Sequence, residues 1–104
     1  MQIELYINGE KKIFTAPFVP MLAKRKYLEI EAKAEERKTA PSPTEQLEEE
    51  NELFSILADV VFKGQFTVED IYSGANDEYA YKKLRESVFG EPKTEGNEGN
   101  EQGK

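Results

Sequence analysis

The sequence has no cysteine and no histidine. Without cysteine, the chain can form no disulfide and offers neither a thiol nucleophile nor a thiolate metal site. Without histidine, it lacks the commonest general base and the commonest transition-metal ligand. A glycine-rich phosphate-binding loop is also missing from the sequence. The remaining carboxylates and lysines outline no catalytic site, so we predict a non-enzymatic protein that uses no metal and no cofactor.

Long apolar runs and an excess of positive charge are missing as well. No apolar run approaches the roughly 20 residues of a membrane span, and no signal peptide opens the sequence, which favours a cytoplasmic protein. The 21 acidic side chains outnumber the 14 basic ones and give a formal net charge of -7. Nucleic acid and anionic membranes repel such a chain, so we expect neither as a direct partner.

A long capped helix is predicted in the middle of the chain, over residues 43–63. Ser42 is a good N-cap, Glu45 stands three residues later as in a capping box, and Gly64 follows the expected end. The helix begins with acidic residues and becomes apolar nearly all round, which indicates that its second half enters a core. Its predicted apolar face comprises Leu47, Phe54, Leu57, Ala58 and Val61.

Two further helices follow. Thr67, with Asp70 three residues on, caps a short helix over 68–73 that Gly74 is expected to end. Asn76 is a plausible cap for the last helix, over 77–89.

Residues 2–15 read as a β-hairpin, because apolar and polar residues alternate over residues 2–7, the turn signal Asn8-Gly9 follows, and residues 10–15 can return as the second strand. A two-residue loop would place Leu5 opposite Lys12. A three-residue loop with a bulge would place Leu5 opposite Ile13 and keep both on one face. We favour the second register.

A helix over about 20–38 should follow the hairpin, with Pro20 at its first position. Its apolar stripe is thin and is flanked by many charged residues. The stripe is assigned to Met21, Leu22, Tyr27, Leu28, Ile30 and Ala32.

The predicted fold class is α+β, mainly α-helical. A single small domain over residues 1–90 places an N-terminal β-hairpin against three to four helices. Residues 91–104 contain no apolar side chain, so their burial cannot offset the entropy of ordering, and we predict a disordered acidic tail.

The charge clusters have simple structural interpretations. Glu48–Glu50 lacks the alternating ligands of a calcium loop and is better explained as the solvated start of a helix. Lys24–Lys26 is a short basic cluster, which suits a solvated face or contact with an acidic partner surface.

Aromatic side chains are numerous for so small a domain, and some could stay exposed as anchors for a partner. Phe18, in a connector framed by prolines, and Tyr79, on the last helix, are the strongest cases. The candidate partner-binding residues are Phe18, Lys24, Arg25, Tyr27 and Tyr79.

Two segments resemble a known family. Residues 7–20 include INGEKK and TAPFVP, and residues 61–74 read VFKGQFTVEDIYSG. Both are similar to segments of the tail assembly chaperones of long-tailed phages and prophages of Gram-positive bacteria. With the intervening helices, the resemblance covers roughly residues 3–90.

The resemblance implies a protein without catalytic residues, made as the short form of a gene whose longer form arises by frameshifting. Such chaperones bind the tape measure protein, keep it soluble and help recruit the tail tube protein. They act in the host bacterial cytoplasm and are absent from the mature virion. Because they coat an extended partner in many copies, self-association is implied too.

Two other functions remain open at this point. A small regulatory adaptor would bind one folded protein in a one-to-one complex. A structural tail component would be retained in the phage particle and detected in purified virions.

Overall fold

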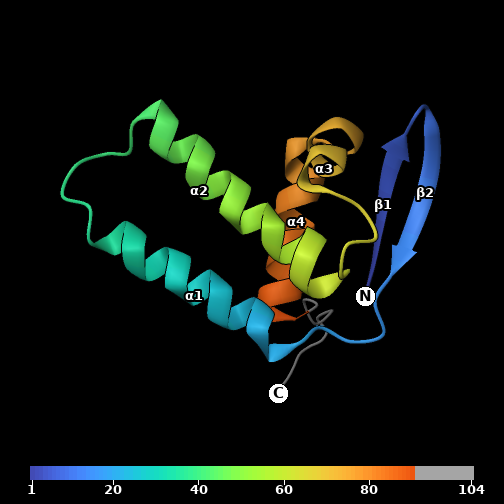
Figure 1. Ribbon diagram of the computed structural model, residues 1–104, viewed down its shortest axis with the longest axis horizontal. Helices are drawn as coiled ribbons and strands as arrows, with labels where there is room; N and C mark the ends of the chain where they lie inside the picture. Colours follow the sequence, from blue (N-terminus) through green and yellow to red (C-terminus); the bar gives the residue numbers. More distant parts are fainter. Residues whose placement is uncertain (91–104) are drawn as a thin grey trace, which may run out of the picture.

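The computed structural model describes residues 1–90 and consists of an N-terminal β-hairpin followed by helices (Figure 1). This confirms the predicted α+β, mainly helical class, while the predicted tail over 91–104 lies outside the described residues. In chain order, the elements are β1 (Gln2–Ile7), β2 (Glu10–Thr15), α1 (Met21–Glu35), α2 (Pro43–Ser55), the π-helix η1 (Ile56–Val61), α3 (Val68–Gly74) and α4 (Asp77–Phe89).

The hairpin lies at one side of the molecule, and α1 and α2 extend from the other (Figure 1). The short helix α3 packs against β1, whereas α4 packs against both α1 and η1. The centre of the core therefore combines residues from the hairpin with residues from the second half of the long central helix. Its largest fully buried side chains are Ile3, Leu5, Phe54, Ile56, Leu57, Val61, Phe62 and Ile71.

Both predicted capping boxes are present. The Ser42 hydroxyl accepts a hydrogen bond of 3.2 Å from the Glu45 amide, and the Glu45 carboxylate accepts one of 2.8 Å from the Ser42 amide. The amide of Ser42 lowers the pKa of Glu45 because it stabilises the carboxylate. Thr67 and Asp70 form the same reciprocal pair, at 3.1 and 2.9 Å.

The central helix was predicted to remain α-helical to residue 63, and this prediction is wrong. After α2 the chain widens into η1, where the Phe62 amide donates to the Leu57 carbonyl at 2.9 Å. Four of the six residues of η1 are buried: Ile56, Leu57, Ala58 and Val61. The left-handed backbone of Lys63 and Gly64 then ends the helix.

The favoured hairpin register is wrong. Leu5 pairs with Lys12 and Ile7 with Glu10, so the hairpin has the two-residue loop Asn8-Gly9, with positive φ at both positions. The Asn8-Gly9 turn determines the register. Ile13 on β2 does not, because it is more than half exposed and is not held against the core.

Gly74 is the last residue of α3, although the sequence placed it beyond the helix end. A glycine is needed here for close packing and not to end the helix. A Cβ at residue 74 would lie 2.6 Å from the Tyr6 carbonyl oxygen, so only glycine allows α3 to approach β1 this closely.

The apolar stripe predicted for the first long helix mixes two opposite faces. Of the predicted residues, Ile30 is buried and Tyr27 half-buried, whereas Met21, Leu22, Leu28 and Ala32 are exposed. Ala23, which the prediction left out, is buried. The helix is also shorter than predicted, running from Met21 to Glu35 with Pro20 as its N-cap. On α2, Leu47 of the predicted apolar face is exposed as well, because it lies on the part of the helix that extends beyond the core.

Candidate functional site

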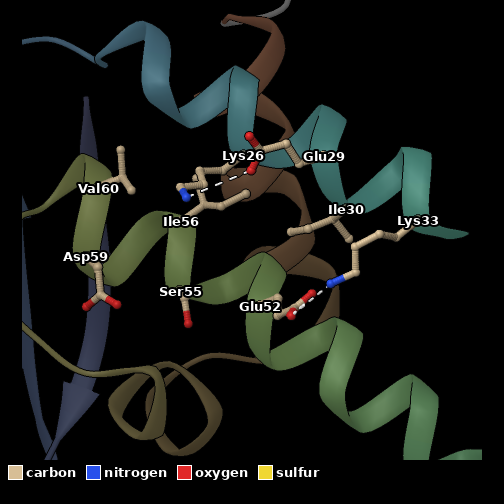
Figure 2. Close-up of a pocket in the computed structure, with 9 residues that line it drawn as sticks. All are labelled: Lys26, Glu29, Ile30, Lys33, Glu52, Ser55, Ile56, Asp59 and Val60. Carbon is tan, nitrogen blue, oxygen red and sulfur yellow. Dashed lines mark ion pairs between the residues drawn. The ribbon is translucent and has the colours of Figure 1, made fainter.

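A groove of about 370 Å³ runs between α1 and the continuous helix α2–η1. Figure 2 shows Ile30 on one wall, with Ile56 and Val60 on the other. Charged side chains surround these three apolar residues. They are Lys26, Glu29, Lys33, Glu52 and Asp59.

Ion pairs connect the two walls toward the far end of this groove. Lys33 Nζ lies 3.5 Å from a Glu52 carboxylate oxygen (Figure 2). Farther along the two helices, Arg37 Nη1 donates to Glu49 at 2.9 Å. The hydrogen bond from Arg37 to Glu49 raises the pKa of the Arg37 guanidinium. Charged contacts rather than a continuous apolar seam therefore hold the ends of α1 and α2 together.

A second hollow, of about 320 Å³, lies where α1 begins and α4 ends. These two helix ends meet at the lower side of Figure 1. Val19, Met21 and Val88 line the hollow together with Lys24 and Glu86. Phe89 follows Val88 and is 62% exposed, and Met21 is 90% exposed. The name apolar end patch covers the apolar residues Val19, Met21 and Val88 that line the hollow, of which Val88 is buried, together with their exposed sequence neighbours Phe18 and Phe89.

Three of the predicted partner-binding residues lie at or near this patch. Phe18 belongs to it and is 64% exposed. Lys24 lines the hollow. Tyr27 packs its ring edge against Phe89, with the ring centroids 5.4 Å apart. Burial raises the pKa of Tyr27, and the neighbouring carboxylate of Glu31 raises it further.

The other two lie elsewhere or have other contacts. Arg25 forms an ion pair with Glu29 on its own helix, at 3.4 Å. The Tyr79 hydroxyl accepts a hydrogen bond of 3.0 Å from the Glu4 amide, on the outer edge of β1. Ten residues of α4, or about 15 Å, separate Tyr79 from Phe89, so Tyr79 does not join the apolar end patch.

Tyr81, whose pKa is raised most among the tyrosines, packs at the edge of the core. Burial raises the pKa of Tyr81, and so does the hydrogen bond that its hydroxyl donates to Glu50 at 2.6 Å. The rings of Tyr81 and Tyr72 both pack edge-on against Phe54, at 5.0 and 6.0 Å. The contacts of Tyr81 with Glu50 and of both tyrosine rings with Phe54 join α2, α3 and α4.

Comparison with protein-family models gives a match to the family described as phage tail chaperone protein, and the match covers residues 1–104. The chain belongs to the phage tail chaperone family. No curated protein and no solved structure matches it.

Membership of the phage tail chaperone family fixes the broad role of the protein. It is a tail assembly chaperone, it acts during assembly, and its partners are proteins of the phage tail. This family is not an enzyme family. Within residues 1–90, no three acidic side chains are grouped so as to hold a metal ion. None of the helices described is long and apolar enough to cross a membrane.

Met21, Leu28 and Phe89 were not among the predicted contact residues of this tail chaperone. Met21 and Leu28 were instead assigned to the apolar stripe of their helix. The missing signal was that residues 23, 27, 30 and 34 already form a complete inward series on α1. Met21 and Leu28 lie on the opposite face, so they could have been separated from the core by spacing alone.

Proposed function

We propose that this tail chaperone binds the tape measure protein in the host cytoplasm, keeps it soluble and helps recruit tail tube subunits around it. Several copies act along one tape measure molecule. The observation that carries the proposal is the apolar end patch, where Phe18, Met21 and Phe89 expose most of their side chains to solvent.

The patch suits an amphipathic helix of the partner. Its hollow has apolar walls, and Lys24 and Glu86 at its rim offer one charge of each sign to polar flanks of a bound segment. Covering an apolar stripe in this way would prevent partner molecules from associating with one another. The net charge of -7 would keep the complex soluble.

Co-expression with the tape measure protein from the same phage tests the proposal. The soluble fraction is analysed by size-exclusion chromatography with light scattering. We expect a tape measure protein that is insoluble alone to co-elute with several copies of this chain. A one-to-one complex would favour an adaptor, and a tape measure protein that stays insoluble would contradict the proposal.

Two variants test the patch itself. Phe18→Ser and Phe89→Ser should each lower the amount of soluble tape measure protein. Leu47→Ser is the matched control, because Leu47 is 67% exposed on α2, away from the patch. Circular dichroism establishes that each variant is folded. Equal loss in all three folded variants would place the binding surface elsewhere.

A further inference from the structure

Helix α1 has an apolar inner face and a second, partly apolar face on its outside. The inner face consists of Ala23, Tyr27, Ile30 and Ala34, which are buried or half-buried. The outer face consists of Met21, Arg25, Leu28 and Ala32, all exposed, with Leu28 at 53%. At 100° per residue, the two faces point in nearly opposite directions.

The outer face has the spacing of a helix-pairing seam. Its positions are four, three and four residues apart, which is the alternation that keeps a stripe facing one partner helix. A helix that needs only to pack on its own core has no use for a second such series. Some other helix must therefore cover it if its apolar side chains are to leave water.

Charge along α1 is divided between its two halves. Residues 24–26 are all basic, whereas Glu29, Glu31 and Glu35 make the second half mainly acidic. Lys33 is the basic residue of the second half, but it points away from the outer face and pairs with Glu52 across the groove. A helix with this pattern is complementary to an antiparallel copy of itself.

We propose that the outer face of α1 pairs antiparallel with α1 of a second copy of this chain. The inference rests on the proposed self-association and names its surface and geometry. Antiparallel pairing places Lys24 and Arg25 beside Glu31 and Glu35 of the copy. Parallel pairing about a two-fold axis would instead place Arg25 against Arg25 of the copy, where like charges repel.

The geometry also locates the two-fold axis. Leu28 is midway between the ends of α1, Met21 and Glu35, so a fully overlapped antiparallel pair brings each Leu28 to its own counterpart. The 15-residue helix is about 22 Å long. So short a seam buries less surface than a permanent dimer, and the association is therefore weak and depends on concentration.

Sedimentation equilibrium of this chain alone, without the tape measure protein, tests the pairing. The parent chain should shift from monomer to dimer with rising concentration. Leu28→Glu should raise the dimer dissociation constant by about tenfold or more, because each dimer loses the contact between its two leucine side chains and gains two like charges there. The matched control Leu47→Glu places the same charge at an exposed leucine of α2 and should leave the constant unchanged.

Charge reversal tests the antiparallel direction. Lys24→Glu or Glu31→Lys alone should weaken the dimer, and the double variant should restore it, because each reversed residue then faces the other. Because the chain has no cysteine, Leu28→Cys introduces the sole thiol. That variant should form a covalent dimer under mild oxidation far faster than Leu47→Cys.

Several outcomes would overturn the pairing. They are a parent chain that stays monomeric, equal effects of the two leucine variants, and a double reversal that restores nothing. Loss of tape measure solubility in Leu28→Glu, with self-association unchanged, would assign the outer face to the tape measure protein instead. The proposed function would stand in each of these cases, because its own readout is the soluble complex.

Discussion

The Tyr81 hydroxyl donates a hydrogen bond of 2.6 Å to a carboxylate oxygen of Glu50, which joins α4 to α2 across 31 residues of sequence. Tyr81→Phe removes this bond while keeping the ring on Phe54. Because Glu50 is partly solvated, we expect the free energy of unfolding at neutral pH to fall by about 1 kcal/mol. Urea denaturation measures it, and Tyr6→Phe, at an exposed ring, is the control.

The same pair makes stability depend on alkaline pH. The folded state raises the pKa of Tyr81 above the unfolded value of about 10, so its contribution is complete below about pH 10 and is lost as the pH rises. Above that pH the parent should lose stability faster than Tyr81→Phe. The difference should be well under about 1.4 kcal/mol per pH unit, since Tyr81 is only partly buried. Parallel pH profiles for the two proteins would contradict the assignment.

Gly74→Ala should destabilise the fold, although alanine normally favours a helix over glycine. The new Cβ would lie 2.6 Å from the Tyr6 carbonyl oxygen and would force α3 away from β1. We expect a loss of about 1–3 kcal/mol in the free energy of unfolding, as for other overpacked sites. Ser73→Ala, at the preceding exposed position, should be nearly neutral in the same denaturation experiment.

Thr67→Ala removes the side-chain cap of α3. In the parent chain the Thr67 hydroxyl accepts a hydrogen bond of 3.1 Å from the Asp70 amide. The expected cost is about 1 kcal/mol. Thr67→Ser keeps the hydroxyl and should recover most of that loss in thermal unfolding. Equal destabilisation by alanine and serine would show that the methyl group, rather than the cap, matters at this position.

Arg37→Gln should loosen the far end of the α1–α2 pair, because it breaks the 2.9 Å contact with Glu49. Hydrogen exchange followed by mass spectrometry should show faster exchange in the last turn of α1 and the first half of α2. Raising the salt concentration should produce a weaker form of the same change in the parent chain. The β-hairpin, which makes no contact with this ion pair, serves as the internal control and should exchange unchanged.

Sequence reasoning succeeded where the determining contacts are local. The capping boxes at Ser42 and Thr67 join residues three apart, so their spacing alone identified two helix starts. The left-handed Gly64 likewise followed from its position after an apolar helix. Family membership was also within reach, since short motifs carried the resemblance that the family match confirms.

It failed where the determining contacts are distant. The hydrogen bond between Tyr79 and Glu4 spans 75 residues, and no pattern in the sequence predicts it. One failure was local: the Asn8-Gly9 turn determines the hairpin register, whereas the prediction chose a register that keeps Leu5 and Ile13 on one face, and only Leu5 is buried. The two faces of α1 were merged because a thin apolar stripe was assumed to have one direction. The contact of Tyr79 and the two faces of α1 both depend on packing between distant segments.

The π-helical turn over Ile56–Val61 has a consequence for how this family can vary in length. Its 5-residue hydrogen-bond spacing between Leu57 and Phe62 contains one residue more than an α-helical turn. A single deletion within η1, for example at the exposed Asp59, could be absorbed by a return to α-helix without breaking the helix. Homologous chains should therefore tolerate one-residue gaps here more readily than elsewhere in the core, and aligned family sequences would reveal them.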